Sequence, residues 1–308
     1  MKDLFYLGEF TALLFLLGAS QAALITGISV ILFPELGAIA YGVLSKPHGS
    51  WAKEPFLLVL TPTLAAIIGI IIERYWGYSP LSVSLSIALA LLVIYILRSP
   101  IVPALAAGYL PIILGEDSIS YPIAVFVTIS LLVLLLTLLR PYYAKHSDQS
   151  HQGKPEDLLK IDRYGLISFI VFVFLMQTMV YFSGLKFILF PPLVVVSYEI
   201  LTKPDHCPWG KQLIRLLILT VVMVGVGLMS LHFLGNHSLA ILITVLIGIL
   251  LCRTLGVYLP PAMAMGLLPF VAPHPDIKLL ISIVIGISVF IVYYFLYNQF
   301  FVKSTESN

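Results

Sequence analysis

The sequence predicts an all-α polytopic membrane protein made of two parallel tandem repeats of about six crossings each, with short or broken helices. Its composition, an internal duplication and the distribution of basic residues support this prediction. Of the 308 residues, 60% are hydrophobic and 10% are charged, whereas a typical soluble domain has roughly 25% charged residues. The mean hydropathy is +1.04. Lipid, rather than a soluble core, must therefore cover most of the chain.

Two sequence blocks recur in the same order in the two halves of the chain. The first block is FPELGAIAYGVLSKPHGSWAK at 33–53 and FPPLVVVSYEILTKPDHCPWGK at 190–211. The second is PALAAGYLP at 103–111 and PAMAMGLLP at 261–269, and its small residues are typical of close helix packing. Such self-similarity indicates a duplicated unit.

The polar stretch between the halves sets the domain boundaries. Residues 1–140 form the first transmembrane repeat, 141–163 a cytoplasmic linker, and 164–308 the second transmembrane repeat. The linker contains HSDQSHQGKPED, which is hydrophilic over its whole length. We therefore expect a linker there and not a further domain.

Each half contains four long apolar segments and two short ones. The long ones lie near 9–33, 55–73, 80–98 and 120–139, and then near 164–189, 212–233, 237–253 and 277–302. The short ones lie near 34–45, 100–114, 190–202 and 256–272. A spanning helix needs about 20 residues, and the short segments would give helices of roughly 17–25 Å in a hydrocarbon core of roughly 30 Å. Irregular backbone at that depth is tolerated where it is buried in protein or lines a cavity.

The lysines and arginines indicate the orientation. If all twelve segments cross and the N-terminus is inside, fourteen of the 17 lie inside, and only Arg74, Lys186 and Lys278 lie outside. Re-entrant short segments would instead move Lys46 and Lys53 outside and weaken this bias. Because cytoplasmic loops are enriched in Lys and Arg, we expect a multi-pass protein of the cell membrane with both termini in the cytoplasm. An even number of crossings makes the repeats parallel.

The residues that carry chemistry are few. No nucleotide-binding, hydrolase or zinc-protease motif is present, and no run of basic residues suggests a nucleic acid partner. We expect neither a catalytic residue, a metal nor a cofactor. The two cysteines, Cys207 and Cys252, both fall on the cytoplasmic side and are expected to be reduced thiols.

Prolines and lysines bound the short second segment of each repeat. Pro34 and Pro191 open it, so that backbone N–H groups at a helix start can face an anion. Lys46 and Lys203 close it, each followed by a proline. The alternatives are that the prolines only start helices and that the lysines are ordinary positive-inside anchors.

Further candidates lie near the second block and inside the apolar segments. Arg98 and Arg253 precede the two copies of the second block, as donors to an anion or as snorkelling anchors. Glu35, Glu199 and Glu9 are acids in or beside apolar segments, where ionisable groups are expensive. The predicted substrate-binding residues are Pro34, Glu35, Lys46, Arg98, Pro103, Pro191, Lys203, Arg253 and Pro261.

At these blocks the sequence resembles the HPP family of integral membrane proteins. The resemblance rests on LGAIAYGVLSKPHG after the first segment and on YLPPAMAMG in the second half. Leu259 stands where the family triplet has histidine, and the first copy keeps only Pro103 of the two prolines. The resemblance implies a membrane transporter fold, with some members implicated in nitrite transport.

We therefore predict a transporter or channel for a small solute, with an anion favoured and the site between the repeats. The alternative is a membrane protein that binds, flips or processes a phosphorylated lipid carrier, with Lys46, Arg98, Lys203 and Arg253 on its phosphate. A third interpretation is a structural membrane partner without a solute. The expected partners are the lipid bilayer and a small anionic solute or phospholipid-like ligand, and a homo-oligomer stays open.

Overall fold

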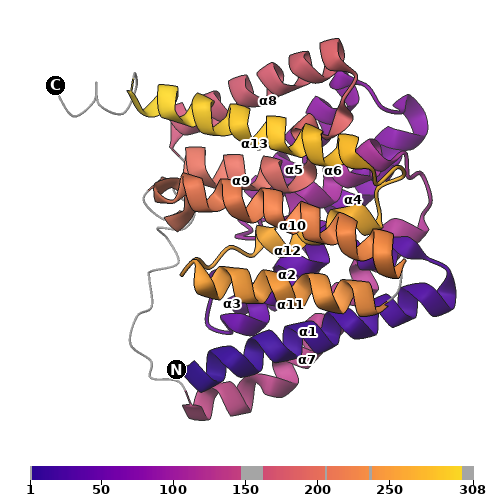
Figure 1. The fold of residues 1–308 in the computed structure, drawn as a ribbon, viewed down its shortest axis with the longest axis vertical. Helices are drawn as coiled ribbons and strands as arrows, with labels where there is room; N and C mark the ends of the chain where they lie inside the picture. Colours follow the sequence, from indigo (N-terminus) through magenta and orange to yellow (C-terminus); the bar gives the residue numbers. More distant parts are fainter. Residues whose placement is uncertain (1, 147–161, 205–206, 236–237, 300–308) are drawn as a thin grey trace.

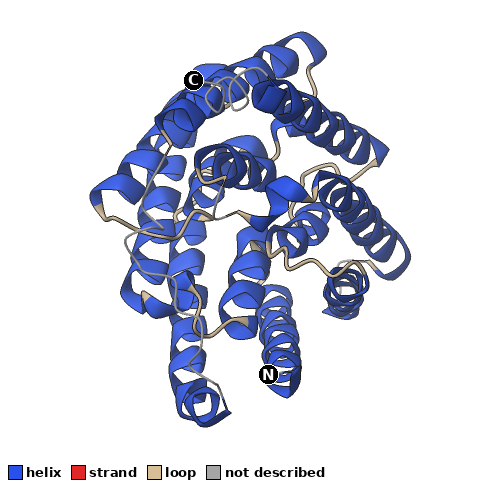
Figure 2. Cartoon of the chain, turned by 90° about the vertical axis from the view of Figure 1, so that its left-hand side faces the viewer, coloured by secondary structure: helices blue, strands red, loops and turns tan. Residues whose placement is uncertain are grey.

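The computed structural model describes residues 2–146, 162–204, 207–235 and 238–299. Within these ranges the chain forms helices and loops and contains no strand (Figure 2). The helices run roughly side by side along one common direction (Figure 1). The all-α architecture expected from the composition is thereby confirmed.

The first half contains α1 to α7. Their bounds are α1 Lys2–Thr26, the 3-10 helix η1 Ser29–Leu32, α2 Pro34–Ser45, α3 Ser50–Lys53, α4 Pro55–Trp76, α5 Pro80–Ile96, α6 Ala104–Leu114 and α7 Ser120–His146. The short segment expected at 34–45 coincides with α2. The residue before each proline is disfavoured in helical geometry, so Pro34, Pro55 and Pro80 each mark a helix start.

The second half contains α8 to α13. Their bounds are α8 Arg163–Ser183, η3 Lys186–Leu189, α9 Pro191–Thr202, η4 Pro208–Lys211, α10 Leu213–Leu234, α11 Ser238–Thr254, α12 Pro261–Leu267, η5 Leu268–Phe270 and α13 Ile277–Tyr297. Helix lengths recur in order: α2 and α9 have 12 residues, α4 and α10 have 22, and α5 and α11 have 17.

Among the described residues, six helices are long and apolar enough to cross a membrane, namely α1, α4, α7, α8, α10 and α13. These helices indicate a multi-pass membrane protein. Two segments expected to be long, 80–98 and 237–253, are the 17-residue helices α5 and α11. At 1.5 Å per residue each is about 26 Å long, somewhat less than a hydrocarbon core of roughly 30 Å.

The first helix of each half ends earlier than the apolar segments predicted. Helix α1 ends at Thr26 instead of near 33, and α8 ends at Ser183 instead of near 189. Gly27 and Gly184 follow with φ of 71° and 70°, the left-handed geometry that commonly closes a helix. A 3-10 helix then leads the chain back into the protein towards α2 or α9.

Helix α7 continues past the expected boundary at 140. It passes through Pro141 and ends at His146. Of the expected linker at 141–163, residues 147–161 lie outside the described residues. Residues 141–146 of the expected linker therefore belong to α7, the last helix of the first half.

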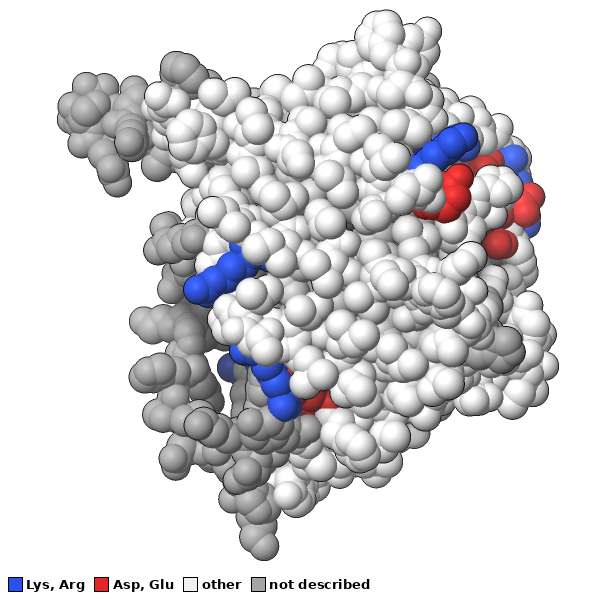
Figure 3. Space-filling model, in the orientation of Figure 1, with Lys and Arg blue, Asp and Glu red and all other residues white. Residues whose placement is uncertain are grey.

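The short helices form the interior and the long helices surround them. Every residue of α2 and of α12 is buried, as are ten of the eleven residues of α6. The long helices instead expose large apolar side chains such as Phe56, Phe174 and Phe233. In Figure 3 the charged residues lie at the two ends of an otherwise uncharged face, which is the distribution that a lipid bilayer requires.

The two halves interlock. Helix α2 packs against α12 of the other half, and α9 packs against α6; likewise α1 meets α11 and α5 meets α8. Glycines permit matching close approaches inside each half. A Cβ added to Gly69 would lie 2.2 Å from the Gly108 carbonyl oxygen, and one added to Gly227 would lie 2.3 Å from the Gly266 carbonyl oxygen.

Most described lysines and arginines gather at one end of the molecule, which we call the basic end. It carries Lys46, Lys53, Arg98, Arg140, Arg163, Lys203, Arg215 and Arg253. The opposite end carries Arg74, Lys186 and Lys278 together with Glu73, Glu116, Asp117 and Asp276. In Figure 3 the basic end is on the left and the opposite end is on the right.

Candidate functional site

A cavity of about 230 Å³ opens at the basic end, where α2 and α9 finish. Residues of both halves line it: Gly42, Lys46, Gly49, Ser50, Trp51, Ala52, Pro100, Glu199, Lys203, Cys207, Trp209, Tyr258 and Pro260. The two copies of the first repeated block therefore meet here. It is the best candidate for a functional site among the described residues, because it combines charged groups with aromatic walls between the two halves.

Local sequence places a lysine at the end of each short helix. Lys46 ends α2 and its backbone N–H donates to the Gly42 carbonyl, while Lys203 ends α9 and its N–H donates to the Glu199 carbonyl. Prolines follow both lysines and disfavour another helical residue. The last carbonyls of a helix are unpaired and carry partial negative charge, so a cation is favoured at these positions even without a ligand.

Two tryptophans form walls of the cavity. Trp51 lies in α3 against α2, where a Cβ added to Gly42 would lie 2.7 Å from the indole Cζ3. Trp209 lies in η4, and its indole N–H donates to the Tyr258 carbonyl oxygen at 2.8 Å. The segment between α2 and α4 thus contributes Lys46 and Trp51 to the cavity, and the segment between α9 and α10 contributes Lys203 and Trp209.

Tyr258 links the cavity to the second repeated block. Its ring centroid lies 3.5 Å from the Lys46 Nζ, a cation–π geometry. Its hydroxyl donates to the Gly42 carbonyl at 2.8 Å, and its ring stacks on Tyr41 with centroids 5.4 Å apart. Lys46 is thus oriented by an aromatic face contributed by the other half.

The cavity lining is not symmetric. In the aligned blocks Tyr258 corresponds to Pro100 and Glu199 corresponds to Gly42, and all four residues border the cavity. The second half therefore adds a phenol and a carboxylate where the first half has neither. Two lysines and one glutamate leave the lining with one excess positive charge when all three are ionised.

The surroundings of the lysines affect their protonation. Desolvation by neighbouring protein atoms lowers the pKa of Lys46. Desolvation also lowers the pKa of Lys203, and the nearby Glu199 acts in the opposite direction. An anion in the cavity would favour the charged form of both lysines and would raise both pKa values.

The prolines expected to open the short helices do so, but far from the cavity. Pro34 and Pro191 are the first residues of α2 and α9, so 12 residues, or about 18 Å, separate each helix start from the lysine end. Pro103 and Pro261 stand at the starts of α6 and α12 and do not line the cavity. Pro100, three residues before Pro103, and Pro260, next to Pro261, do line it.

Glu35 lies in the first turn of α2, away from the cavity. It is 2% exposed, and neither carboxyl oxygen has a hydrogen-bond partner among the described residues. An uncompensated charge at such a position is very costly. The structure therefore separates Glu35 from Glu199, which borders the cavity at the other end of the interior.

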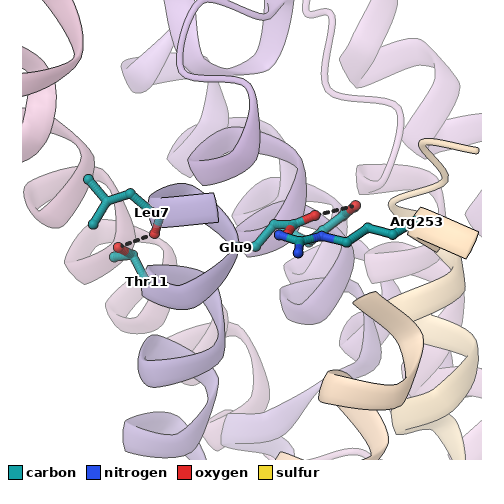
Figure 4. Close-up of polar contacts among 5 residues, drawn as sticks. Leu7, Glu9, Thr11 and Arg253 are labelled. Atoms are coloured by element: carbon teal, nitrogen blue, oxygen red, sulfur yellow. Dashed lines mark hydrogen bonds and ion pairs between the residues drawn. The ribbon is translucent and has the colours of Figure 1, made fainter. Parts of the chain in front are cut away.

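Arg253 forms an ion pair with Glu9 (Figure 4). Glu9 is on α1 and Arg253 is at the end of α11, 244 positions later in the sequence. The Glu9 side chain is 2% exposed and that of Arg253 is 32% exposed. The Tyr41 hydroxyl also donates to Glu9 at 3.4 Å. The pair joins α1 of the first half to α11 of the second half. Arg253 does not line the cavity.

Arg98 and Arg253 occupy different structural positions, although both precede the second repeated block. At the end of α5, the Arg98 N–H donates to the Tyr95 carbonyl and the Ser99 N–H to the Ile94 carbonyl. At the end of α11, the Gly256 N–H donates to the Arg253 carbonyl and the Val257 N–H to the Cys252 carbonyl. Arg98 therefore corresponds to Gly256, and Arg253 corresponds to Tyr95.

This correspondence gives Arg98 an unusual backbone. The hydrogen bonds define a Schellman motif, whose penultimate position is left-handed and usually glycine. Gly256 has φ of 63°, and Arg98 has φ of 48°, the one positive φ of a non-glycine residue among the described residues. A side chain in this region costs about 1–2 kcal/mol. Arg98 is exposed and lies outside the cavity lining.

Sequence reasoning did not find the aromatic members of the site or the partner of Arg253. The tryptophans belong to the repeated block and were visible there, but Tyr258 has no aromatic counterpart in the first half. Glu9 was visible as an acid in an apolar helix, which requires a partner. The described residues hold no group of three or more potential metal ligands, and both cysteines are free and buried.

Comparisons with protein-family models, with curated proteins and with solved structures found no match for this chain.

Proposed function

We propose that this chain is a transporter for a small anion and that Lys46 and Lys203 bind the anion in the cavity at the basic end. One observation carries the proposal: the two repeated Lys–Pro loops, whose lysines are 157 positions apart, border one cavity between the halves. Positive-inside anchoring alone requires lysines at this membrane surface. It does not require them to converge on a common cavity.

The chemistry of the lining favours a small anion. The two lysines supply charge-assisted donors, whereas Glu199 opposes a ligand with high negative charge. The volume of about 230 Å³ lies below the range of about 300–1,000 Å³ that is typical of pockets for drug-sized molecules. An inorganic anion with its waters or a small organic carboxylate matches both the size and the charge. The resemblance to the HPP family agrees with a transporter.

Two parallel repeats provide the framework of the proposal. Its support is the recurrence of helix order and length and the reciprocal exchange of contacts, α2 with α12 and α9 with α6. Parallel repeats are related by an axis along the membrane normal, and sites commonly lie between them. An experimental structure in which the halves superpose about an axis in the membrane plane would contradict this arrangement.

A transporter is favoured over a permanently open channel. The cavity belongs to the basic end, and the first turns of α2 and α9 beyond it are buried. A solute that crosses the protein between the halves must therefore displace the short helices. Alternating movement of two halves around a central site is how repeat-built transporters achieve this.

In the proposed orientation the basic end and both termini face the cytoplasm, because cytoplasmic surfaces are enriched in Lys and Arg. Single cysteines placed at 150 or at 303 should then be protected from an impermeant thiol reagent in intact cells and labelled after permeabilisation. Labelling of intact cells at either position would reverse the orientation.

Ligand-induced thermal stabilisation of the purified protein tests the binding proposal. Nitrite, nitrate, phosphate, acetate and benzoate would be titrated separately against wild type, Lys46→Gln, Lys203→Gln and the control Lys53→Gln. Lys53 is an exposed lysine at the same end that does not line the cavity. A ligand at 100 times its Kd stabilises a protein by about 2.7 kcal/mol.

We expect at least one anion to raise the Tm of wild type and of the Lys53 variant, and to bind about tenfold more weakly to either cavity variant. The Tm without ligand separates loss of binding from loss of folding. Equal weakening in all three variants would show general electrostatics and not a site. Uptake of the stabilising anion into liposomes, present in wild type and lost in Lys46→Gln, would then distinguish transport from binding.

A further inference from the structure

The contact between α5 and α8 contains an apolar hollow that the proposed solute site does not use. Its volume is about 580 Å³, within the usual range for small-molecule pockets. Its lining comes from α5 (Ser84, Ile87, Ala88, Leu91, Leu92, Ile94 and Tyr95), from α8 (Leu166, Phe169, Ile170, Val173 and Phe174), and from Tyr198. Leu92, Tyr95, Ile170 and Phe174 are exposed on the molecular surface, so the hollow opens sideways, toward lipid.

Two arginines flank the end of this hollow that lies at the basic end. Arg98 follows Tyr95 by three residues, and Arg163 is the first residue of α8, three residues before Leu166. Because α5 runs towards the basic end and α8 runs away from it, both arginines lie about one turn beyond the lining. Both are exposed, and neither forms an ion pair within the described part of the chain.

The acidic neighbour of Arg163 is engaged elsewhere. The Asp162 carboxylate accepts hydrogen bonds from the Tyr164 and Gly165 backbone N–H groups at the start of α8. It also accepts one from the Tyr297 hydroxyl. Its position is therefore explained by capping the helix, and among the described residues it forms no ion pair with Arg163.

The backbone of Arg98 provides an independent observation. Its position in the Schellman motif is one where the other half has glycine and where a side chain is strained. Strain that persists in a structure is more often associated with function than ordinary geometry is. An arginine at this position places a guanidinium at the edge of the hollow, at a conformational cost that glycine would remove.

We propose that the α5–α8 hollow binds an anionic phospholipid. One acyl chain lies along the apolar lining, and the phosphate lies between Arg98 and Arg163 at the membrane surface. Basic groups between transmembrane helices, at the level of the headgroups, are a recurrent way to select anionic lipids. Guanidinium groups suit this role because they bind phosphate oxygens in a bidentate manner.

A second hollow in the same molecule offers an internal comparison. The contact between α1 and α7 contains an apolar hollow of about 620 Å³, lined among others by Phe15, Ile31, Ile119 and Leu131. It lies towards the opposite end, beside the loop that carries Glu116 and Asp117. An acyl chain fits it equally well by size, but an anionic headgroup would meet carboxylates there.

Native mass spectrometry of the delipidated full chain tests the proposal. The probes are phosphatidylglycerol and phosphatidylcholine with identical acyl chains, added at equal concentration. We expect at least a fivefold preference of the first bound lipid for phosphatidylglycerol in wild type and in Lys53→Gln. The preference should be lost in the double variant that carries both Arg98→Gln and Arg163→Gln. It should be reduced in the single variant Arg98→Gly. Equal retention of the two lipids by wild type would show ordinary surrounding lipid and would overturn the proposal.

A photoreactive acyl chain locates the lipid. Phosphatidylglycerol with a diazirine in its chain should label peptides of α5 and α8 more strongly than peptides of α1 and α7. The analogous phosphatidylcholine should show no such difference. If the arginine substitutions leave the labelling of α5 and α8 by this phosphatidylglycerol unchanged, the proposal is also contradicted. Lys46→Gln should leave lipid selectivity unchanged, so this test and that of the solute site can fail separately.

Discussion

The two seams between the halves differ, although the helices that form them hold corresponding places in the order of the two halves. At one seam α1 packs closely along α11, and the buried Glu9 carboxylate is paired with Arg253. At the other seam α8 meets α5 in fewer places, and an apolar hollow lies between them. At the positions of Glu9 and Arg253 this seam has Leu166 and Tyr95, which both line the hollow. Among the described residues, the closed seam has an ion pair and the open seam has an apolar hollow in the corresponding place.

Removing Arg253 should have the largest effect on stability. Arg253→Gln leaves the Glu9 carboxylate buried without its cation, and breaking a fully buried pair costs about 3–5 kcal/mol. Because Arg253 is 32% exposed, we expect about 2–3 kcal/mol, measured as a lower unfolding midpoint in detergent. Arg98→Gln, at the open seam, should change the free energy of unfolding by less than about 0.5 kcal/mol.

The double variant sharpens this comparison. Glu9→Gln with Arg253→Gln replaces both charges, so the midpoint should recover at least half of the loss seen with Arg253→Gln alone. If the double variant is as unstable as the sum of the single variants, the pair does not fasten the closed seam and the contrast between the seams has another cause.

The glycine contacts should give matched, intermediate effects in the two halves. Gly69→Ala and Gly227→Ala each place a methyl group over a carbonyl oxygen, at 2.2 and 2.3 Å. Overpacking of this kind costs about 1–3 kcal/mol. Gly225→Ala, on the same helix as Gly227 and with no atom within 4 Å of the added Cβ, is the control. Thermal unfolding that distinguishes Gly69→Ala from Gly227→Ala by more than their experimental error would argue against equivalent halves.

The last expected effect is a small increase in stability. Arg98→Gly relieves a left-handed side chain, worth about 1–2 kcal/mol, and raises the entropy of the unfolded chain, which offsets part of this gain. We expect a net gain of up to about 1 kcal/mol, visible as a slightly higher Tm. Arg98→Ala keeps the strained geometry and should show no gain. A destabilised Arg98→Gly protein would mean that the guanidinium itself supports the fold.

The sequence predicted the helical class, the long apolar helices and the position of α2. These follow from apolar length and from prolines, which act locally. It missed the glycine ends of α1 and α8, because Gly27 and Gly184 are followed by further apolar residues that belong to the 3-10 helices. Composition alone does not distinguish a continued helix from a helix followed by a buried turn.

The convergence of Lys46 and Lys203 was a hypothesis that the repeated block suggested, whereas the pairing of Arg98 with Arg253 was misleading. Both arginines precede the same block, but hydrogen bonds at the helix ends shift their correspondence by three residues. In a helix that is apolar on all sides, periodicity does not define which face is buried. The direction of each arginine therefore depends on tertiary packing, and the Glu9 partner is 244 positions away in the sequence.

The interlocking of the short helices has a consequence for biogenesis. When the ribosome has made the first half, α2 and α6 have their own neighbours but lack α12 and α9, against which they pack in the finished protein. The surfaces of α2 and α6 that these helices cover then stay uncovered until the second half is inserted. We therefore expect the first half to complete its packing only after the second half has been made, so that the order of synthesis becomes part of how the fold is reached.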